Sequence, residues 1–156
     1  MLDRERDPCG LAAGHRVRAL VHRDVRALEG LAVERVPGDV LDPPSLRPLV
    51  DGAEVVFHVA GAISVAGDPS GLVLRTNVEG TRSVAAASLA AGVRRLVHVG
   101  SIHVFSGFPL DAVVDESRPL ADTERAPMAY DRSKALAQRE VAAAVDRGLD
   151  AVSLHP

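Results

Sequence analysis

The sequence predicts an α/β fold in which helices cover both faces of a parallel sheet. Short apolar segments alternate with stretches of helical composition along the chain, which is typical of this class. The segment 54–60 (EVVFHVA) is an almost continuous apolar run, as expected for a strand buried on both faces. Asp39, Gly61 and Ser101 each follow a predicted strand. Ligands bind at that edge of a parallel sheet, so these positions indicate where a site should lie.

The individual elements can be placed in order. Five strands are predicted, over 15–21, 31–36, 54–60, 94–99 and 149–154. Three helices are predicted, over about 42–52, 69–91 and 130–147, and a loop rich in Pro, Asp and Gly covers about 106–127. Asp42 is expected to cap the first helix, because prolines follow it in the first turn. Gly92 and Gly148 are expected to end the second and third helices.

Composition limits the class of protein. A length of 156 residues suits one domain, and 47% apolar with 25% charged residues is ordinary for a globular protein. A net charge of −3 with scattered arginines argues against a nucleic-acid surface, and no apolar run is long enough to span a membrane. The lone Cys9 allows no internal disulfide and suits a reducing cytoplasm. The histidines lack paired ligand spacing, so we expect no metal site.

The most informative pair of residues is Tyr130 and Lys134, the single tyrosine and the single lysine of the chain. The other seventeen basic residues are arginines, which cannot replace a compact ammonium group beside a ligand. Positions i and i+4 lie on one helix face, so the phenol and the ammonium group should be neighbours. A phenol beside a fixed cation is suited to donate or accept a proton. The alternative is a chance pair on an exposed helix face.

The Tyr-x-x-x-Lys motif follows Gly100-Ser101-Ile102-His103-Val104-Phe105. Upstream lie 38–42 (GDVLD), 58–61 (HVAG) and 77–81 (NVEGT), and the chain ends in His155-Pro156. The catalytic set and these four further segments, in this order, together resemble the extended branch of the short-chain dehydrogenase/reductase superfamily, the NAD(P)-dependent epimerase/dehydratase and dihydroflavonol-reductase-like enzymes. The resemblance covers residues 11–156 and implies a partial NAD(P)-binding domain of the Rossmann type.

The resemblance also implies roles for the catalytic set. Tyr130 would be the acid/base, Ser101 would hold the substrate oxygen, and Lys134 would favour the phenolate and bind the nicotinamide ribose. Asn77 would position the lysine. The reaction implied is hydride transfer between NAD(P) and a carbonyl or hydroxyl carbon of a small molecule. His103 is expected only to line the pocket, and Gly80 to permit close packing of a helix on the sheet.

The cofactor contacts are also implied by the resemblance. They are Arg23, Asp39, Val40, Val59, Ala60, Gly61, Val99, Tyr130, Lys134 and Pro156. Asp39 would accept a hydrogen bond from the adenine amino group, although it could also simply cap a turn. Arg23 stands where NAD-preferring enzymes carry an acid, so it favours NADP by meeting the 2′-phosphate. A solvated arginine after a strand is the alternative.

The sequence departs from the family at both ends. Residues 1–10 are polar, and they match neither the first strand nor the G-x-x-G-x-x-G loop that holds the pyrophosphate in relatives. The C-terminal substrate lobe of relatives is also unmatched. We therefore expect a fragment with impaired activity, or alternatively a non-catalytic, cofactor-sensing or inactive module. Helices near 70–91 and 128–147 are expected to serve as a homodimer surface, and the substrate stays open.

Overall fold

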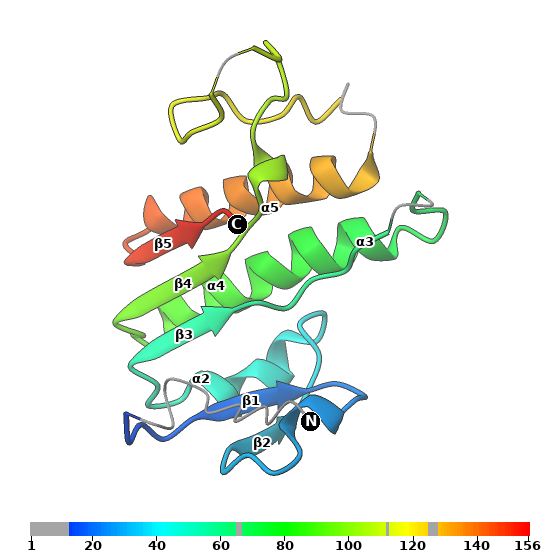
Figure 1. Cartoon of the computed structure of the whole chain (residues 1–156). Coiled ribbons are helices and arrows are strands. Elements are labelled where there is room, and N and C mark those ends of the chain that lie inside the picture. Colours follow the sequence, from blue (N-terminus) through cyan, green and yellow to red (C-terminus); the bar gives the residue numbers. More distant parts are fainter. Residues whose placement is uncertain (1–12, 65–66, 112, 125–127) are drawn as a thin grey trace, which may run out of the picture.

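The computed structural model describes residues 13–64, 67–111, 113–124 and 128–156. Five strands form two parallel sheets (Figure 1): β1 (Arg18–Val21) pairs with β2 (Glu34–Pro37), and β3 (Val55–His58), β4 (Arg95–Val99) and β5 (Ala151–Leu154) form a second sheet in the order β3-β4-β5. Every pairing is parallel, which confirms the predicted class. The strands are shorter than their apolar segments because ladder pairing ends before the apolar runs do.

The two sheets lie edge to edge, with β1 and β3 at the neighbouring edges (Figure 1). Within the described residues β1 pairs only with β2, and β3 pairs only with β4. Among these residues, the order β2-β1 followed by β3-β4-β5 is that of a Rossmann-type sheet with a gap at the position of its central strand. Residues 1–10, which were predicted to match neither the first strand nor the glycine loop of the family, lie outside the described residues.

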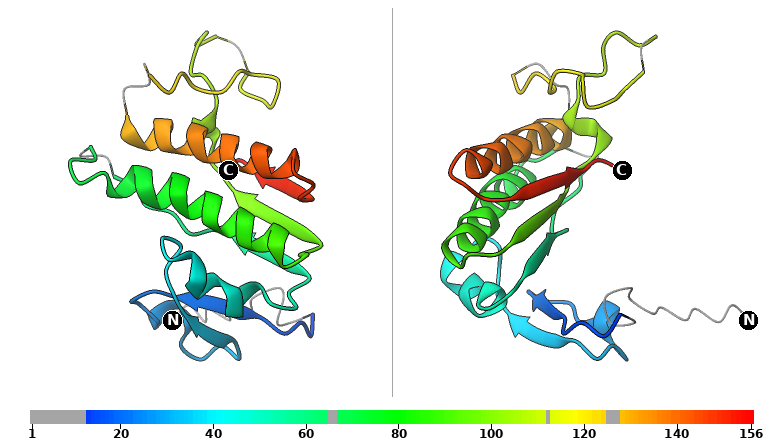
Figure 2. Two further views of the ribbon diagram at one scale, coloured as in Figure 1. Left: turned by 180° about the vertical axis from the view of Figure 1, so that it is seen from behind. Right: turned by 90° about the vertical axis from the view of Figure 1, so that its left-hand side faces the viewer.

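Three α-helices pack on the sheets: α2 (Arg47–Val50), α4 (Gly80–Ala90) and α5 (Ala129–Val145). All three lie on the same side, as the edge-on view of Figure 2 shows. The sequence predicted helices on both faces, and these three lie on one of them. The opposite side of β3 and β5 carries the exposed apolar side chains of Phe57, Val59, Val152 and Leu154.

The second predicted helix contains a wider turn. It begins with α3 (Leu72–Leu74), continues as a π-helical segment, η3 (Arg75–Glu79), and ends as α4. A π segment adds a residue to the turn and is frequent at functional sites. Here it holds Asn77, which is 2% exposed.

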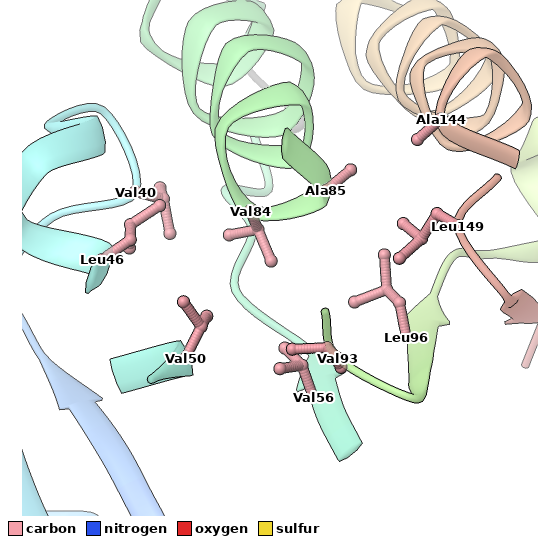
Figure 3. Packing of buried hydrophobic residues seen from close by; sticks show 10 residues of the cluster. All are labelled: Val40, Leu46, Val50, Val56, Val84, Ala85, Val93, Leu96, Ala144 and Leu149. Carbon is pink, nitrogen blue, oxygen red and sulfur yellow. The ribbon is translucent and has the colours of Figure 1, made fainter. Parts of the chain in front are cut away.

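The core lies between the sheets and the helices. Ten buried apolar residues form it (Figure 3): Val40, Leu46, Val50, Val56, Val84, Ala85, Val93, Leu96, Ala144 and Leu149. Gly80 allows α4 to approach this core, because a Cβ atom there would lie 2.7 Å from Cγ2 of Val40. The close packing expected at Gly80 is therefore present, although its partner is the segment after β2 and not a strand.

The helix ends follow the sequence signals in two of three cases. Gly92 and Gly148 have φ angles of +68° and +101°, in the region that glycine adopts at helix C-termini. The prediction for Asp42 is wrong in one respect: it precedes the 3₁₀ segment η2 (Pro43–Leu46), but its side chain makes no capping hydrogen bond. Instead Ser45 Oγ donates to the carbonyl oxygens of Asp39 and Asp42, which orders this turn.

No helix of the described residues combines the length and apolar character that crossing a membrane requires.

Candidate active site

Tyr130 and Lys134 lie on the same face at the beginning of α5, as their spacing predicts. The ammonium nitrogen of Lys134 is 5.8 Å from the centre of the Tyr130 ring. Lys134 is only 8% exposed, and this burial lowers the pKa of its ammonium group. The pair therefore places a desolvated cation beside a phenol.

Ser101 lies two residues after the end of β4, where the short 3₁₀ helix η4 (Ile102–Val104) begins. Its backbone is extended, its side chain is buried, and its Oγ accepts a hydrogen bond of 3.3 Å from the backbone N–H of His103. The next residue, Ile102, donates its N–H to the carbonyl oxygen of Pro156. Ser101 is thus fixed by the short 3₁₀ helix η4 (Ile102–Val104), which packs on α5.

His103 joins the strand end to the helix. Its ring lies edge-on to the Tyr130 ring, with centroids 5.7 Å apart at 70°, and its Nδ1 is 3.1 Å from Oδ1 of Asp131. Asp131 was missed from the sequence, although its place beside Tyr130 in the first turn of a helix could have drawn attention to it. His103 is therefore a direct neighbour of Tyr130. This position is compatible with the expectation that His103 lines the pocket.

Asn77 connects three segments of the chain. Its side-chain amide donates to the carbonyl oxygen of Ala62 and to Ser133 Oγ, at 2.9 and 2.8 Å, and its Oδ1 accepts from the N–H of Ala62 at 2.7 Å. Ser133 Oγ in turn donates to the carbonyl oxygen of Tyr130. Asn77 thus holds the loop after β3 against the first turn of α5, next to Lys134.

A buried histidine pair lies beneath this network, and the sequence reading missed it. His58 and His98 are direct partners in the β3–β4 ladder, with ring centroids 5.3 Å apart. His58 Nε2 lies 2.9 Å from Thr81 Oγ1, whose proton goes to the carbonyl oxygen of Asn77 at 2.6 Å. The hydroxyl is then the acceptor, so His58 carries its proton on Nε2. The signal available in the sequence was a histidine in each of two neighbouring buried strands.

Both histidines are kept neutral by their surroundings. Burial, with a smaller contribution from the charge of Lys134, lowers the pKa of His58 to about 4. Burial, followed by the charges of His58, Lys134 and His155, lowers that of His98 to about 3. Neither ring nitrogen of His98 has a hydrogen-bond partner among the described residues. An imidazolium at either position would be strongly disfavoured.

The residues predicted to hold the adenosine end lie together after β1 and β2. Asp39 Oδ1 accepts from the N–H of Leu41 at 2.9 Å, and its Oδ2 is 3.3 Å from Nε2 of His22. Turn capping by Asp39 is therefore present. Val40 is buried against Gly80, and Arg23 is exposed at the turn after β1.

Three residues that were predicted to contact the cofactor follow β3 directly. Val59, Ala60 and Gly61 are exposed. A Cβ atom on Gly61 would lie 3.2 Å from Oδ1 of Asn77 and 3.6 Å from Nζ of Lys134. Val99 is the last residue of β4 and is paired with Leu154 of β5. Pro156 follows Leu154 by two residues. The predicted site residues thus gather at the carboxyl ends of the strands, in one group around Tyr130 and another around Asp39.

The chain was compared with known proteins. Residues 16–154 match the 3-beta hydroxysteroid dehydrogenase/isomerase family. Sterol demethylase protein B of Methylococcus capsulatus is 36% identical over 94% of the chain and 44% of that protein. A 2-alkyl-3-oxoalkanoate reductase of Stenotrophomonas maltophilia is 32% identical over 92% and 43%. The chain spans less than half the length of these curated relatives.

Solved structures agree with this result. The crystal structure of gox2253 superposes with a TM-score of 0.84 at 30% identity, over 94% of the chain and 45% of its own length. A short-chain dehydrogenase/reductase superfamily protein from Agrobacterium tumefaciens, solved with bound NAD, gives a TM-score of 0.73 at 29% identity over 94% and 43%. The resemblance to short-chain dehydrogenase/reductases is confirmed.

Proposed function

Because the chain belongs to the 3-beta hydroxysteroid dehydrogenase/isomerase family, we propose that it carries the machinery for hydride transfer between NAD(P) and a small molecule. The reacting atom is a carbonyl or hydroxyl carbon. The observation that supports the proposal is that His103 contacts both Ser101 Oγ, through its backbone N–H, and the ring of Tyr130, which lies beside Lys134. A reductase, a dehydrogenase and an epimerase all need such a group, because each must move a proton while a hydride moves.

Each residue has a distinct task in this proposal. Ser101 Oγ donates a hydrogen bond to the substrate carbonyl oxygen, and Tyr130 gives its proton to that oxygen as the carbon is reduced. The nearby ammonium group of Lys134 stabilises the phenolate that remains. Asn77 acts through Ser133 by holding the first turn of α5 in place.

NAD(P) is the hydride carrier, and the residues present fit part of it. Lys134 and Tyr130 would meet the nicotinamide ribose beside Gly61, where a side chain would crowd Asn77 and Lys134. Asp39 and Val40 would meet the adenine, with Val59, Ala60, Val99 and Pro156 along the sheet edge between. Exposed Arg23 would pair with a 2′-phosphate, which favours NADP. The printed sequence contains no G-x-x-G-x-x-G loop for the pyrophosphate.

The missing glycine loop supports a second candidate, a folded module that does not turn over. Calorimetric titration of NADPH and NAD into the purified chain separates the two candidates. We expect weak binding and slow reduction, since one anchoring element is not in the sequence. Tight binding would contradict the proposed impairment. No measurable binding, together with no turnover, would favour the non-catalytic module.

The catalytic assignment is tested with NADPH-dependent reduction of a panel of small ketones and aldehydes. Tyr130→Phe removes the proton donor and should lower the rate by about 100-fold or more. His15→Gln changes an exposed histidine before β1, outside the residues assigned to the site, and serves as the control. An unimpaired Tyr130→Phe variant would show that the acid lies elsewhere.

Self-association belongs to the same proposal. The alanine-rich outer faces of α4 and α5, which Arg82 and Glu140 join through two hydrogen bonds, are proposed as a homodimer surface. Sedimentation equilibrium that gives only the monomer mass would contradict it.

A further inference from the structure

The His103–Asp131 pair stands beside the proposed proton donor and has no task in the proposed mechanism. Its two members come from different elements, η4 and the first turn of α5. Their contact of 3.1 Å joins Nδ1 of His103 to Oδ1 of Asp131. His103 is half-exposed, with 51% of its side chain accessible, whereas Asp131 is 18% exposed.

The burial of Asp131 explains why the imidazole is held there. Its Oδ1 is inaccessible to solvent and lies in no well-aligned hydrogen bond among the described residues. A buried carboxylate oxygen without a partner costs free energy. The group that faces this oxygen is Nδ1 of His103, 3.1 Å away. The contact therefore fixes which ring nitrogen faces the protein, and Nε2 is the one left for a ligand.

The position of the ring indicates what this ligand group is. The imidazole stands edge-on to Tyr130, and the backbone N–H of His103 donates to Ser101 Oγ, so the ring borders the place where the proposed function puts the reacting oxygen. A substrate group reaching His103 Nε2 is therefore close to the reacting carbon. With Asp131 on the other side of the ring, an anionic oxygen completes a carboxylate–imidazolium–carboxylate arrangement.

We propose that His103, held by Asp131, is a specificity-determining residue that binds a carboxylate located one or two carbons from the reacting carbon. This rests on the proposed function, because it takes the oxygen between Ser101 and Tyr130 as the reacting one. The substrate class is then a short-chain oxo or hydroxy acid. The imidazolium donates Nε2–H to the substrate carboxylate and Nδ1–H toward Asp131, and no covalent bond changes in this contact.

The test compares two probes that differ by the carboxylate alone, 3-hydroxyoctanoate and 2-heptanol, in the chain without cofactor. Binding is followed by NMR of protein labelled with ¹⁵N at histidine, which reports the protonation of both ring nitrogens of His103. The wild-type chain should bind the hydroxy acid about tenfold more tightly than the alcohol, the effect of one charge-assisted hydrogen bond. Both His103 nitrogens should become protonated on binding.

His103→Gln should abolish this preference and leave the affinity for 2-heptanol unchanged, and Asp131→Asn should reduce it. His15→Gln is the matched control and should keep the wild-type preference. Equal affinities for the two probes in the wild type, failure to bind the hydroxy acid, or a preference that survives in His103→Gln would each overturn the proposal.

The outcome is distinguishable from failure of the proposed function. Tyr130→Phe lacks the proton donor but retains the His103–Asp131 pair, so it should bind the hydroxy acid with the wild-type preference. A carboxylate preference that persists while Tyr130→Phe leaves turnover unimpaired would support the His103 contact and reject the catalytic assignment.

Discussion

At the scale of single residues, Asn77 is a buried side chain whose loss should be costly. Its three side-chain hydrogen bonds join the loop after β3 to α5, and the residue is buried. Asn77→Ala would leave the N–H and carbonyl groups of Ala62 without these partners. Unsatisfied buried groups cost about 1–3 kcal/mol each, so the free energy of unfolding should fall by about 2 kcal/mol or more.

Urea denaturation measures this loss. Ser83→Ala, in α4, is the control, because it removes a single exposed hydrogen bond from Ser83 Oγ to the carbonyl oxygen of Glu79. This substitution should change the free energy of unfolding by less than about 1 kcal/mol. Equal effects of the two substitutions would show that the Asn77 network does not stabilise the fold.

At the scale of elements, the approach of α4 to the segment after β2 depends on Gly80. Alanine is the better helix former by about 1 kcal/mol, so an unconstrained Gly80→Ala would stabilise the helix. Here the new Cβ would lie 2.7 Å from the stiff side chain of Val40. The cost of this overpacking should exceed the gain in helix propensity, so the free energy of unfolding should fall by about 1–3 kcal/mol.

A double-mutant cycle with Val40→Ala isolates this contact. The added methyl group should be tolerated better when Val40 is already shortened, with a coupling energy of about 1 kcal/mol. Strictly additive free energies of unfolding would contradict the close approach.

The elements also show what sequence patterns can reveal. Strand and helix positions were predictable because apolar runs and terminal glycines are local signals, and both Gly92 and Gly148 have the expected positive φ. The Tyr130–Lys134 contact was predictable from helical periodicity alone. The pairing of His103 with Asp131 was not, because it depends on how η4 packs on α5. The π turn at Asn77 was not predictable either, because the low helix propensity of Thr76, Asn77 and Val78 does not distinguish a π turn from an α turn.

At the scale of the whole molecule, the buried histidine pair makes stability depend on pH. The folded-state pKa values of His58 and His98 lie below the ordinary value of 6.5. Between about pH 4 and 6.5 the unfolded chain therefore binds more protons than the folded chain. Stability is then full above pH 6.5 and falls as the pH decreases, by about 2 kcal/mol per histidine at pH 5.

Thermal or urea unfolding at pH 7.5, 6 and 5 checks this dependence, in a range where most carboxylates stay ionised. His98→Gln removes one titrating group and should flatten the profile, whatever its effect at pH 7.5. A wild-type profile that is flat from pH 7.5 to 5 would show that the pair is not shielded from solvent.

The π-helical segment Arg75–Glu79 has a consequence for sequence change in this helix. A π turn contains one residue more than an α turn, so the helix carries a removable residue at this place. Deleting Thr76 would allow an unbroken α-helix and keep Gly80 and the rest of α4 in register with the core. The same deletion would replace the wide turn that contains Asn77 by an ordinary α turn, and so change the position of its amide group relative to Ala62 and Ser133. Folding and the assembly of the Asn77 network could thus be separated by the loss of a single codon.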